Sequence, residues 1–249
     1  MSAAAGPRIF EHLFVLGRPA GGKSEFIAFM KALGDRERAE RFGIGRFEEV
    51  DDFPWLWDVC VDDDAREARG EPRVSSERVP EGYNITEPGF RGGLVSRFNE
   101  TIGRKYLSSP SFYESGTVLI EFARGRDDGF RQSLERFQPE ILRRAAILYI
   151  QVSFEESYRR NSARYQQAQK ESILFHKVPD RDMYGFFREN DWDELTGGAP
   201  DGTLALAGVP VPFVSMPNEP ESTDPLVLGP RYRAALTRLR ALKYGETQG

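Results

Sequence analysis

A run of glycines followed by lysine and serine lies close to the start of the chain, in the segment LFVLGRPAGGKS at 13–24. Gly17, Gly22, Lys23 and Ser24 fit the pattern G-x-x-x-x-G-K-[ST] without a gap. Glycines allow successive backbone N–H groups to curl around phosphate oxygens, and a helix that begins there adds its positive end. In such a loop Lys23 neutralises the terminal phosphates of a nucleotide and Ser24 binds Mg²⁺. The alternative is a glycine-rich turn that contains Lys-Ser by coincidence, but the apolar strand before it and the helix after it favour a phosphate loop.

The residues that this pattern predicts to bind a nucleotide are Gly17, Ala20, Gly21, Gly22, Lys23, Ser24 and Glu25.

Acidic residues follow two of the predicted strands. Segment 46–50 leads directly into Asp51 and Asp52, and segment 117–121 is apolar until it ends in Glu121. Phosphoryl transfer to an alcohol needs an oriented hydroxyl, an acceptor for its proton and positive charge around the moving group. Asp51 or Asp52 would accept the proton and hold Mg²⁺ through water, and we favour Asp51 because it is nearer the strand end. A turn or a helix cap is the alternative for this pair.

Glu121 is the second predicted acidic group of the site. We expect it to hold Mg²⁺ through water or to hold the substrate, so the predicted metal set is Ser24, Asp51 and Glu121. The alternative for Glu121 is an ion pair with Arg124 or Arg126, which follow it closely.

Apolar strands alternate with helical segments along the chain. We predict strands at 12–16, 46–50, 117–121, 145–152 and 211–215, and helices at 23–33, 91–107, 129–143, from 154 onward and at 230–243. Pro139 is expected to start a new helical turn, and 61–90 and 196–210 are expected to be loops. Continuous apolar strands that alternate with helices indicate an α/β fold with a parallel sheet covered on both faces. Ligands of such sheets bind at the carboxyl ends of the strands.

Together these motifs resemble the P-loop small-molecule kinases, and their layout is most similar to the uridine kinase and nicotinamide riboside kinase branch. In that branch the strand after the first helix delivers an aspartate to the acceptor hydroxyl, often within Asp-Asp-Phe, which here is Asp51-Asp52-Phe53. The third strand of the family ends in a glutamate, here Glu121, although Phe122 stands where the family often has glycine. The resemblance covers about 12–165.

The resemblance implies a kinase-type P-loop NTPase fold with a parallel five-stranded sheet, helices on both faces, and ATP and Mg²⁺ as cofactors. We expect a single domain over 1–249, with lid or acceptor insertions at about 61–93 and 160–200. The loop at 216–221 lies where related kinases pass the adenine ring.

Related kinases carry a mobile lid after the fourth strand, and its arginines close on the phosphates. Here Arg159, Arg160 and Arg164 follow that strand, and Arg160 and Arg164 lie one helical turn apart. The resemblance therefore implies a catalytic role for Arg160 and Arg164, with a solvated helix face as the alternative.

Three other arginines and a group of aromatic residues are candidates for the acceptor site. Arg91, Arg97 and Arg124 would grip the acceptor, with a structural role as the alternative for each. Phe53, Trp55 and Trp57 would form a wall for a planar or apolar acceptor, with core packing as the alternative. For His176 an acceptor pocket and a surface position are both open, and the run at 62–64 (DDD) is expected to be a solvated face.

Composition narrows the function classes. The 34 basic and 39 acidic residues give a net charge of −5, which argues against a surface coated for nucleic acid. One cysteine excludes an intrachain disulfide, and two widely separated histidines match no zinc spacing. No signal-peptide pattern and no apolar run of membrane-spanning length are present, so we expect a cytoplasmic protein without a membrane partner.

The sequence therefore predicts an ATP- and Mg²⁺-dependent kinase that transfers a γ-phosphoryl group to the hydroxyl of a small, nucleoside-like or ring-bearing molecule. The alternative is a P-loop ATPase or nucleotide-dependent switch that acts on a macromolecular partner. The choice between ATP and GTP, the identity of the acceptor and the oligomeric state stay open at this stage.

Overall fold

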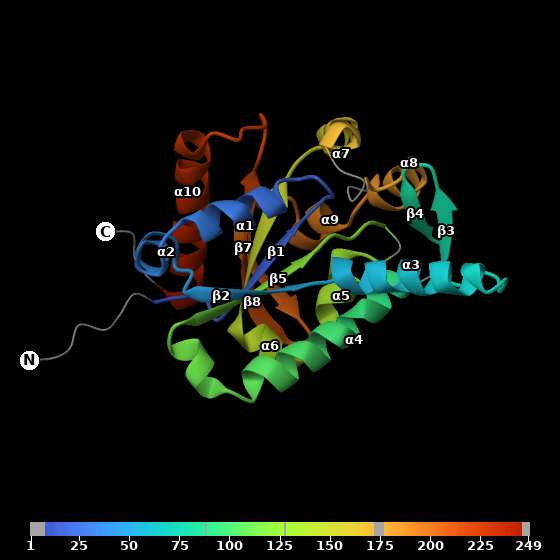
Figure 1. Ribbon diagram of the computed structural model, residues 1–249. Coiled ribbons are helices and arrows are strands. Elements are labelled where there is room, and N and C mark those ends of the chain that lie inside the picture. The colour runs from blue at the N-terminus through green and yellow to red at the C-terminus, as the bar shows by residue number, and fades with distance from the viewer. Residues whose placement is uncertain (1–7, 88, 127, 172–176, 246–249) are drawn as a thin grey trace, which may run out of the picture.

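The computed structural model describes residues 8–87, 89–126, 128–171 (backbone only from 165) and 177–245. Its centre is a six-stranded sheet with the strand order β2-β5-β1-β6-β8-β7, in which all neighbours are parallel except β7 and β8 (Figure 1). The strands of this sheet are β1 (His12–Gly17), β2 (Arg46–Asp51), β5 (Gly116–Phe122), β6 (Ala145–Gln151), β7 (Asp201–Leu206) and β8 (Val209–Pro217). The five parallel strands lie where the sequence predicts them.

Strand β7 corrects the prediction of a loop at 196–210. It pairs antiparallel with β8 at the edge of the sheet, so the sheet has six strands rather than five. A two-residue turn joins the two strands, and both of its residues, Ala207 and Gly208, have positive φ angles of 46° and 76°. Such angles are typical of tight hairpin turns. The Gly-, Ala- and Pro-rich composition that favours a loop thus contains a hairpin.

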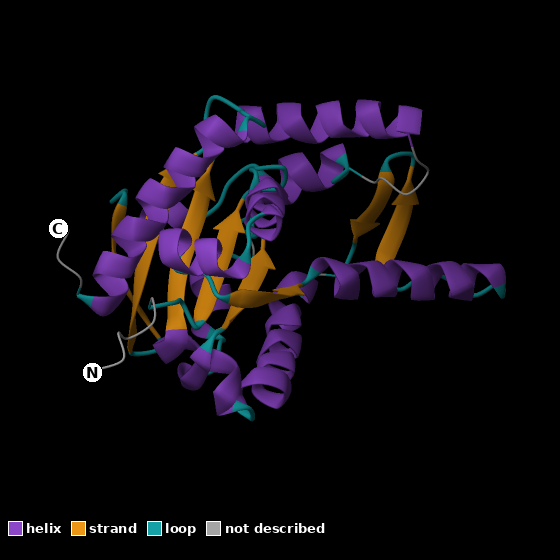
Figure 2. Ribbon diagram, turned by 60° about the vertical axis from the view of Figure 1, so that its left-hand side comes forward, coloured by secondary structure: helices purple, strands orange, loops and turns teal. Residues whose placement is uncertain are grey.

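Helices cover both faces of the sheet, as predicted (Figures 1 and 2). They are α1 (Lys23–Ala32), α2 (Asp35–Phe42), α3 (Phe53–Ala68), α4 (Phe90–Ile102), α5 (Phe130–Glu135), α6 (Pro139–Arg144), α7 (Phe154–Glu171), α8 (Asp180–Asp182), α9 (Trp192–Thr196) and α10 (Pro225–Tyr244), with the shorter turns η1 (Gly103–Leu107), η2 (Pro110–Glu114) and η3 (Met183–Phe187). Pro139 begins α6, which confirms the predicted break.

The core has two parts, one on each face of the sheet. On one face α1, α2 and α10 pack through residues such as Phe26, Phe42 and Tyr232, all fully buried. On the other, α4, α5, α6 and α9 pack through residues such as Phe98 and Trp192. The central strands are buried on both sides, which explains their continuous apolar sequences.

The segment 61–90 also differs from the predicted loop. Helix α3 continues to Ala68, and the antiparallel strands β3 (Ser76–Val79) and β4 (Gly82–Ile85) form a hairpin that stands apart from the main sheet, between α3 and α8 (Figures 1 and 2). Asp63 anchors the hairpin, because its buried carboxylate accepts backbone N–H groups of Val74, Ser75 and Ser76 at 2.8–3.0 Å.

Two members of the acidic run at 62–64 are therefore not a solvated face. Asp63 is buried, and Asp64 accepts hydrogen bonds from Arg73 at 2.5 Å and from the Tyr83 hydroxyl at 2.6 Å. These carboxylates fix the hairpin against α3 because each is satisfied by several donors. None of the described helices is both long and apolar enough to cross a membrane.

Candidate active site

The glycine-rich loop joins the end of β1 to the start of α1, as the sequence predicts. Gly22 has a φ of 110°, and a Cβ there would lie 2.3 Å from the Asn218 side-chain nitrogen, so only glycine fits. The Lys23 ammonium is buried and folds back on the loop, where it donates to the Arg18 carbonyl at 3.0 Å and to the Gly17 carbonyl at 3.4 Å. The loop is thus curled around the Lys23 amine.

A cavity of about 390 Å³ opens beside this loop, at the carboxyl ends of β2 and β5. Its lining combines Ala20, Lys23 and Ser24 of the loop with the acids that end the strands and with aromatic residues of α3. Ligand sites of parallel sheets are expected at this edge.

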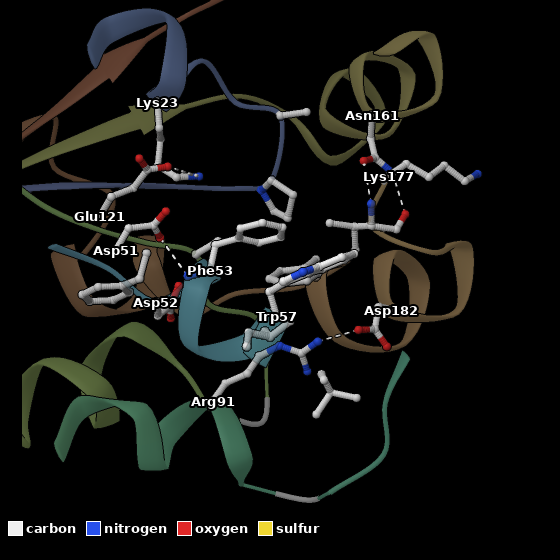
Figure 3. Close-up of a pocket in the computed structure, with 18 of the residues that line it drawn as sticks. Lys23, Asp51, Asp52, Phe53, Trp57, Arg91, Glu121, Asn161, Lys177 and Asp182 are labelled. Carbon is white, nitrogen blue, oxygen red and sulfur yellow. Dashed lines mark hydrogen bonds and ion pairs between the residues drawn. The ribbon is translucent and has the colours of Figure 1, made fainter. Parts of the chain in front are cut away.

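Asp51 and Glu121 face each other across β2 and β5. They are register partners, so their side chains leave the sheet on the same face, and Figure 3 shows both next to Lys23. The Lys23 Nζ lies 3.9 Å from the Glu121 Oε1. The alternative for Glu121, an ion pair with Arg124 or Arg126, is not found among the described residues: these arginines pair with Asp52 and Glu189.

Burial changes the acidity of both groups. It raises the pKa of Glu121 from 4.5 to about 7, since the attraction of Lys23 only partly offsets desolvation and the nearby Asp51 adds repulsion. The pKa of Asp51 rises from 3.8 to about 6 for the same main reason, although its Oδ1 accepts the Phe53 N–H at 3.0 Å. Carboxyls with raised pKa values beside a buried amine are typical of sites that move protons.

Asp52 has a different environment from Asp51. Its Oδ2 accepts a hydrogen bond from Arg124 Nη1 at 2.7 Å, and the Arg124 side chain is almost fully buried. The same guanidinium donates to the Ser133 hydroxyl at 2.9 Å and to the Arg91 carbonyl at 3.0 Å. Arg124 therefore holds Asp52 and the start of α4 together, and it lines the cavity with its charge already compensated.

No protein-family model matches the sequence, and no curated protein is significantly similar to it. Among solved structures, similarity is found to the protein APE1195, with 14% identity over 96% of this chain and 98% of the other and a TM-score of 0.41. The Pnkp1/Rnl/Hen1 RNA repair complex matches with 12% identity over 85% of this chain and 51% of the other, at a TM-score of 0.39. A sugar kinase from Janibacter sp. HTCC2649 matches with 18% identity over 70% of this chain and 82% of the other, at a TM-score of 0.30. At these identities and TM-scores the similarities define no family for this chain.

The two predicted lid arginines, Arg160 and Arg164, have different environments. Arg160 is 2% exposed and donates to the Asn218 carbonyl at 2.7 Å, to Glu156 at 2.7 Å and to the Gly21 carbonyl at 3.4 Å. These contacts favour a structural role for Arg160, and its predicted catalytic role stays a prediction. Arg164 is partly exposed, lines the cavity and pairs with Glu25.

The loop at 216–221 lies directly beside the phosphate loop. The Asn218 amide donates to the Gly21 carbonyl at 2.9 Å, and Glu219 accepts the Ser153 N–H at 2.5 Å. The structure thus places this segment beside the glycine-rich loop, and its contact with an adenine ring stays a prediction.

Of the acceptor candidates, Arg91 enters the cavity and Arg97 does not. Arg91 forms a 2.5 Å ion pair with Asp182 and lies 4.3 Å from the ring centroid of Phe186. Arg97 is exposed on α4, outside the cavity lining.

Of the predicted aromatic wall, Phe53 and Trp57 reach the cavity and Trp55 does not. Phe53 and Trp57 line the cavity, with their rings stacked at a centroid distance of 6.1 Å (Figure 3). Tyr83 of the hairpin extends this wall with its ring edge-on to Trp57 at 5.6 Å. Trp55 instead packs into the core against Phe98 at 5.0 Å, so core packing is the correct interpretation there.

Sequence reasoning missed the residues that close the far side of the cavity. Asn161 of α7 and the segment from Lys177 to Phe187 line it, including Asp182 (Figure 3). No short motif marks these residues individually, and the sequence indicates them only as part of the predicted lid or acceptor insertion at about 160–200. His176 lies outside the described residues.

Proposed function

We propose that the chain is a kinase-type P-loop NTPase that transfers the γ-phosphoryl group of Mg-ATP to a hydroxyl of a small molecule. One observation carries the proposal: Asp51 and Glu121 face the Lys23 amine within one cavity, while the neighbouring Asp52 is neutralised by Arg124. This arrangement supplies a proton acceptor and a positive charge at the two ends of a transferable phosphoryl group.

Each residue has a defined task in this reaction. The acceptor hydroxyl passes its proton to the carboxylate of Asp51 as its oxygen forms a bond to the γ-phosphorus. The bond between that phosphorus and the β–γ bridging oxygen breaks, and ADP leaves with the electron pair. Lys23 and the partly exposed Arg164 offset the negative charge of the phosphates.

The side chains present are suited to Mg²⁺. The exposed hydroxyl of Ser24 lines the cavity with the oxygens of Asp51 and Glu121, and all three are the hard oxygen ligands that Mg²⁺ prefers. Within the described residues no group of three or more His, Cys, Asp or Glu could hold a metal by itself. Mg²⁺ is usually bound through one or two carboxylates, and water and substrate phosphates complete its shell. When bound, the ion would neutralise negative charge on the phosphates.

The cavity favours an uncharged, ring-bearing acceptor. Phe53, Trp57 and Tyr83 offer flat apolar surfaces, and Phe53 is 56% exposed, so a planar ligand can stack on it. The cations at this end have carboxylate partners, since Arg91 pairs with Asp182 and Lys177 with Asp180 at 2.7 Å. An acceptor that already carries a phosphate would have to break these pairs.

The deciding experiment is the release of ADP from Mg-ATP, measured with the protein alone and then with pools of nucleosides, nucleotides, sugars, amino alcohols and hydroxylated natural products. We expect one pool to stimulate release and the Lys23→Ala variant to lose that stimulation while it remains folded. Mg-GTP in the same assay identifies the preferred nucleotide. Slow release that ignores every pool would instead support an ATPase or switch with a macromolecular partner. Unchanged turnover in Lys23→Ala would contradict both.

A further inference from the structure

Arg18, the first residue after Gly17 in the phosphate loop, sends its side chain away from the loop and across to the far wall of the cavity. Its guanidinium donates to the carbonyls of Phe187 and, at 3.1 Å, of Arg188. It also lies 5.9 Å from the ring centroid of Phe154 at the start of α7. A residue of the cradle therefore contacts a segment about 170 positions later in the chain.

These carbonyls belong to the end of a helical segment. The last turn of a helix leaves its C=O groups without intrahelical partners, and a cation at that end is favourable. The segment α8–η3 ends at Phe187, and Arg18 supplies both the donors and the positive charge there. The preceding carbonyl, that of Phe186, accepts the backbone N–H of Arg126 at 3.1 Å.

The backbone of Arg18 faces the other way, into the cradle. Its carbonyl accepts the Lys23 ammonium at 3.0 Å and the Gly21 N–H at 3.2 Å. A single residue thus bonds the phosphate-binding lysine through its carbonyl and the opposite wall through its guanidinium. If the loop moves when it binds phosphate, the Arg18 guanidinium and its partners in the opposite wall must move or lose their contacts.

The wall itself, residues 177–188, lines the side of the cavity where the proposed acceptor would bind. Val178, Pro179, Asp182 and Phe187 line the cavity. The other end of the wall is held on α7, because the Asn161 side chain donates to the Val178 carbonyl at 2.8 Å and accepts its N–H at 3.1 Å.

We propose that Arg18 is a positioning residue that couples the phosphate cradle to the wall at 177–188, so that a nucleotide in the cradle orders the acceptor side of the cavity. The inference rests on the proposed function, because it assumes that the cradle binds nucleotide. Coupling between two sites is reciprocal, so an acceptor on the wall tightens nucleotide binding by the same factor.

The test uses Mg-ADP as the probe and needs no identified acceptor. Hydrogen exchange of the backbone amides in 177–188 is measured with and without saturating Mg-ADP in the native chain, Arg18→Met and Arg126→Met. Methionine at 18 keeps the bulk and removes the donors. Arg126→Met is the matched control, because it removes an exposed guanidinium beside the wall but keeps the backbone N–H that caps Phe186.

We expect Mg-ADP to slow exchange in 177–188 by about fivefold or more in the native chain and in Arg126→Met. In Arg18→Met this slowing should disappear although Mg-ADP still binds, and Arg18→Lys, which keeps the charge and one donor group, should restore part of it. A merely structural role would instead speed exchange in 177–188 equally with and without nucleotide. Slowing in Arg18→Met equal to that of the native chain, or none in the native chain, would overturn the inference.

Two further outcomes separate this inference from the proposed function. Direct titration that detects no Mg-ADP binding to the native chain would overturn the proposed function, and the inference with it. Normal binding without transmission to 177–188 would overturn the inference alone. If Arg18→Met does not fold, Arg18→Lys carries the comparison, and full native slowing in that variant together with unaltered affinity would show that two carbonyl-directed donors are not needed.

Discussion

The guanidinium of Arg124 lies 2.7 Å from the carboxylate of Asp52, and this ion pair separates the tasks of two neighbouring aspartates. Asp52 is held by a nearly inaccessible cation, whereas Asp51 stands in register with Glu121 and faces Lys23. A carboxylate oxygen already held by a buried arginine is less available to an acceptor hydroxyl. Burial raises the pKa of Asp51 to about 6, and we therefore assign the proposed base to Asp51.

Alanine substitutions at these two positions should therefore affect different quantities, turnover at Asp51 and stability at Asp52. Asp51→Ala should lower kcat by roughly 10²–10⁴-fold, the usual contribution of a general base, with little loss of stability. Asp52→Ala should lower the free energy of unfolding by about 3–5 kcal/mol, because it leaves the buried Arg124 charge without its partner. Denaturant unfolding and turnover of the acceptor identified by ADP release measure the two quantities. If Asp52→Ala abolished turnover at native stability, the assignment of the base would move to Asp52.

The two arginines of α7 allow a similar comparison. Arg160→Met should lower the free energy of unfolding by about 2–4 kcal/mol, because the Asn218 and Glu156 oxygens lose a buried charged donor. Arg164→Met should change stability by less than about 1 kcal/mol, since its ion pair with Glu25 is partly exposed. It should lower kcat by about 10²-fold if its charge meets the phosphates. Native kcat in Arg164→Met would remove this residue from the reaction.

In the ligand-free protein, the ionised carboxylate of Glu121 should lower the free energy of unfolding at neutral and higher pH. A carboxyl whose pKa is raised on folding stabilises the fold while protonated, and that stabilisation is lost as the pH rises from 4.5 through about 7. At about 1.4 kcal/mol per pKa unit the difference corresponds to about 3 kcal/mol. Glu121→Gln should therefore raise the free energy of unfolding at pH 8 by about 1–3 kcal/mol while it lowers turnover.

The measurement for Glu121→Gln is urea unfolding with a chelator and without nucleotide, because a bound cation would stabilise the carboxylate. At pH 4.5 and below, native chain and variant should converge. A variant that is less stable than the native chain at pH 8 would mean that the Lys23 ion pair outweighs desolvation.

The parallel part of the sheet was predictable because its strands are buried on both faces. Strands such as β1 and β6 are almost entirely apolar, as burial on both faces requires. The edge strand β7 was not predictable in this way, since Gly202 and the exposed Thr203 and Ala205 give it the composition of a loop. Segment 61–90 was misread because two of its carboxylates find partners inside the protein rather than solvent: Asp63 accepts backbone N–H groups of the hairpin, and Asp64 pairs with Arg73.

The site was predictable where strand ends fix it. The phosphate loop, Asp51 and Glu121 follow adjacent strands of one parallel sheet, and the carboxyl ends of such strands meet at one edge. Which of Asp51 and Asp52 faces Lys23 was not predictable from the sequence. It depends on the strand register and on the ion pair between Asp52 and Arg124, which lies 72 residues away. The place of Asp182 in the cavity was not predictable either, because its ion pair with Arg91 joins residues 91 positions apart and no local pattern marks such a pair.

A buried histidine gives a last prediction, on acid stability. The Nδ1 of His12 lies 3.0 Å from the Ile141 carbonyl, which can only accept, so the neutral ring carries its proton there and its Nε2 accepts the Tyr113 hydroxyl at 2.7 Å. Burial, together with the charges of Arg144 and Lys243, lowers the pKa of His12 to about 4 against the carbonyl's opposing effect.

Because the unfolded chain binds this proton more readily than the folded one, His12 should lower the free energy of unfolding as the pH falls from about 6.5 to about 4, by up to about 3 kcal/mol. Urea unfolding of the native chain and of His12→Gln over this pH range measures the effect. The carboxyl groups titrate in both proteins and cancel in the difference. The stability of the native chain relative to the variant should decline steadily below pH 6.5, and a difference that is independent of pH would show that His12 is protonated within the fold.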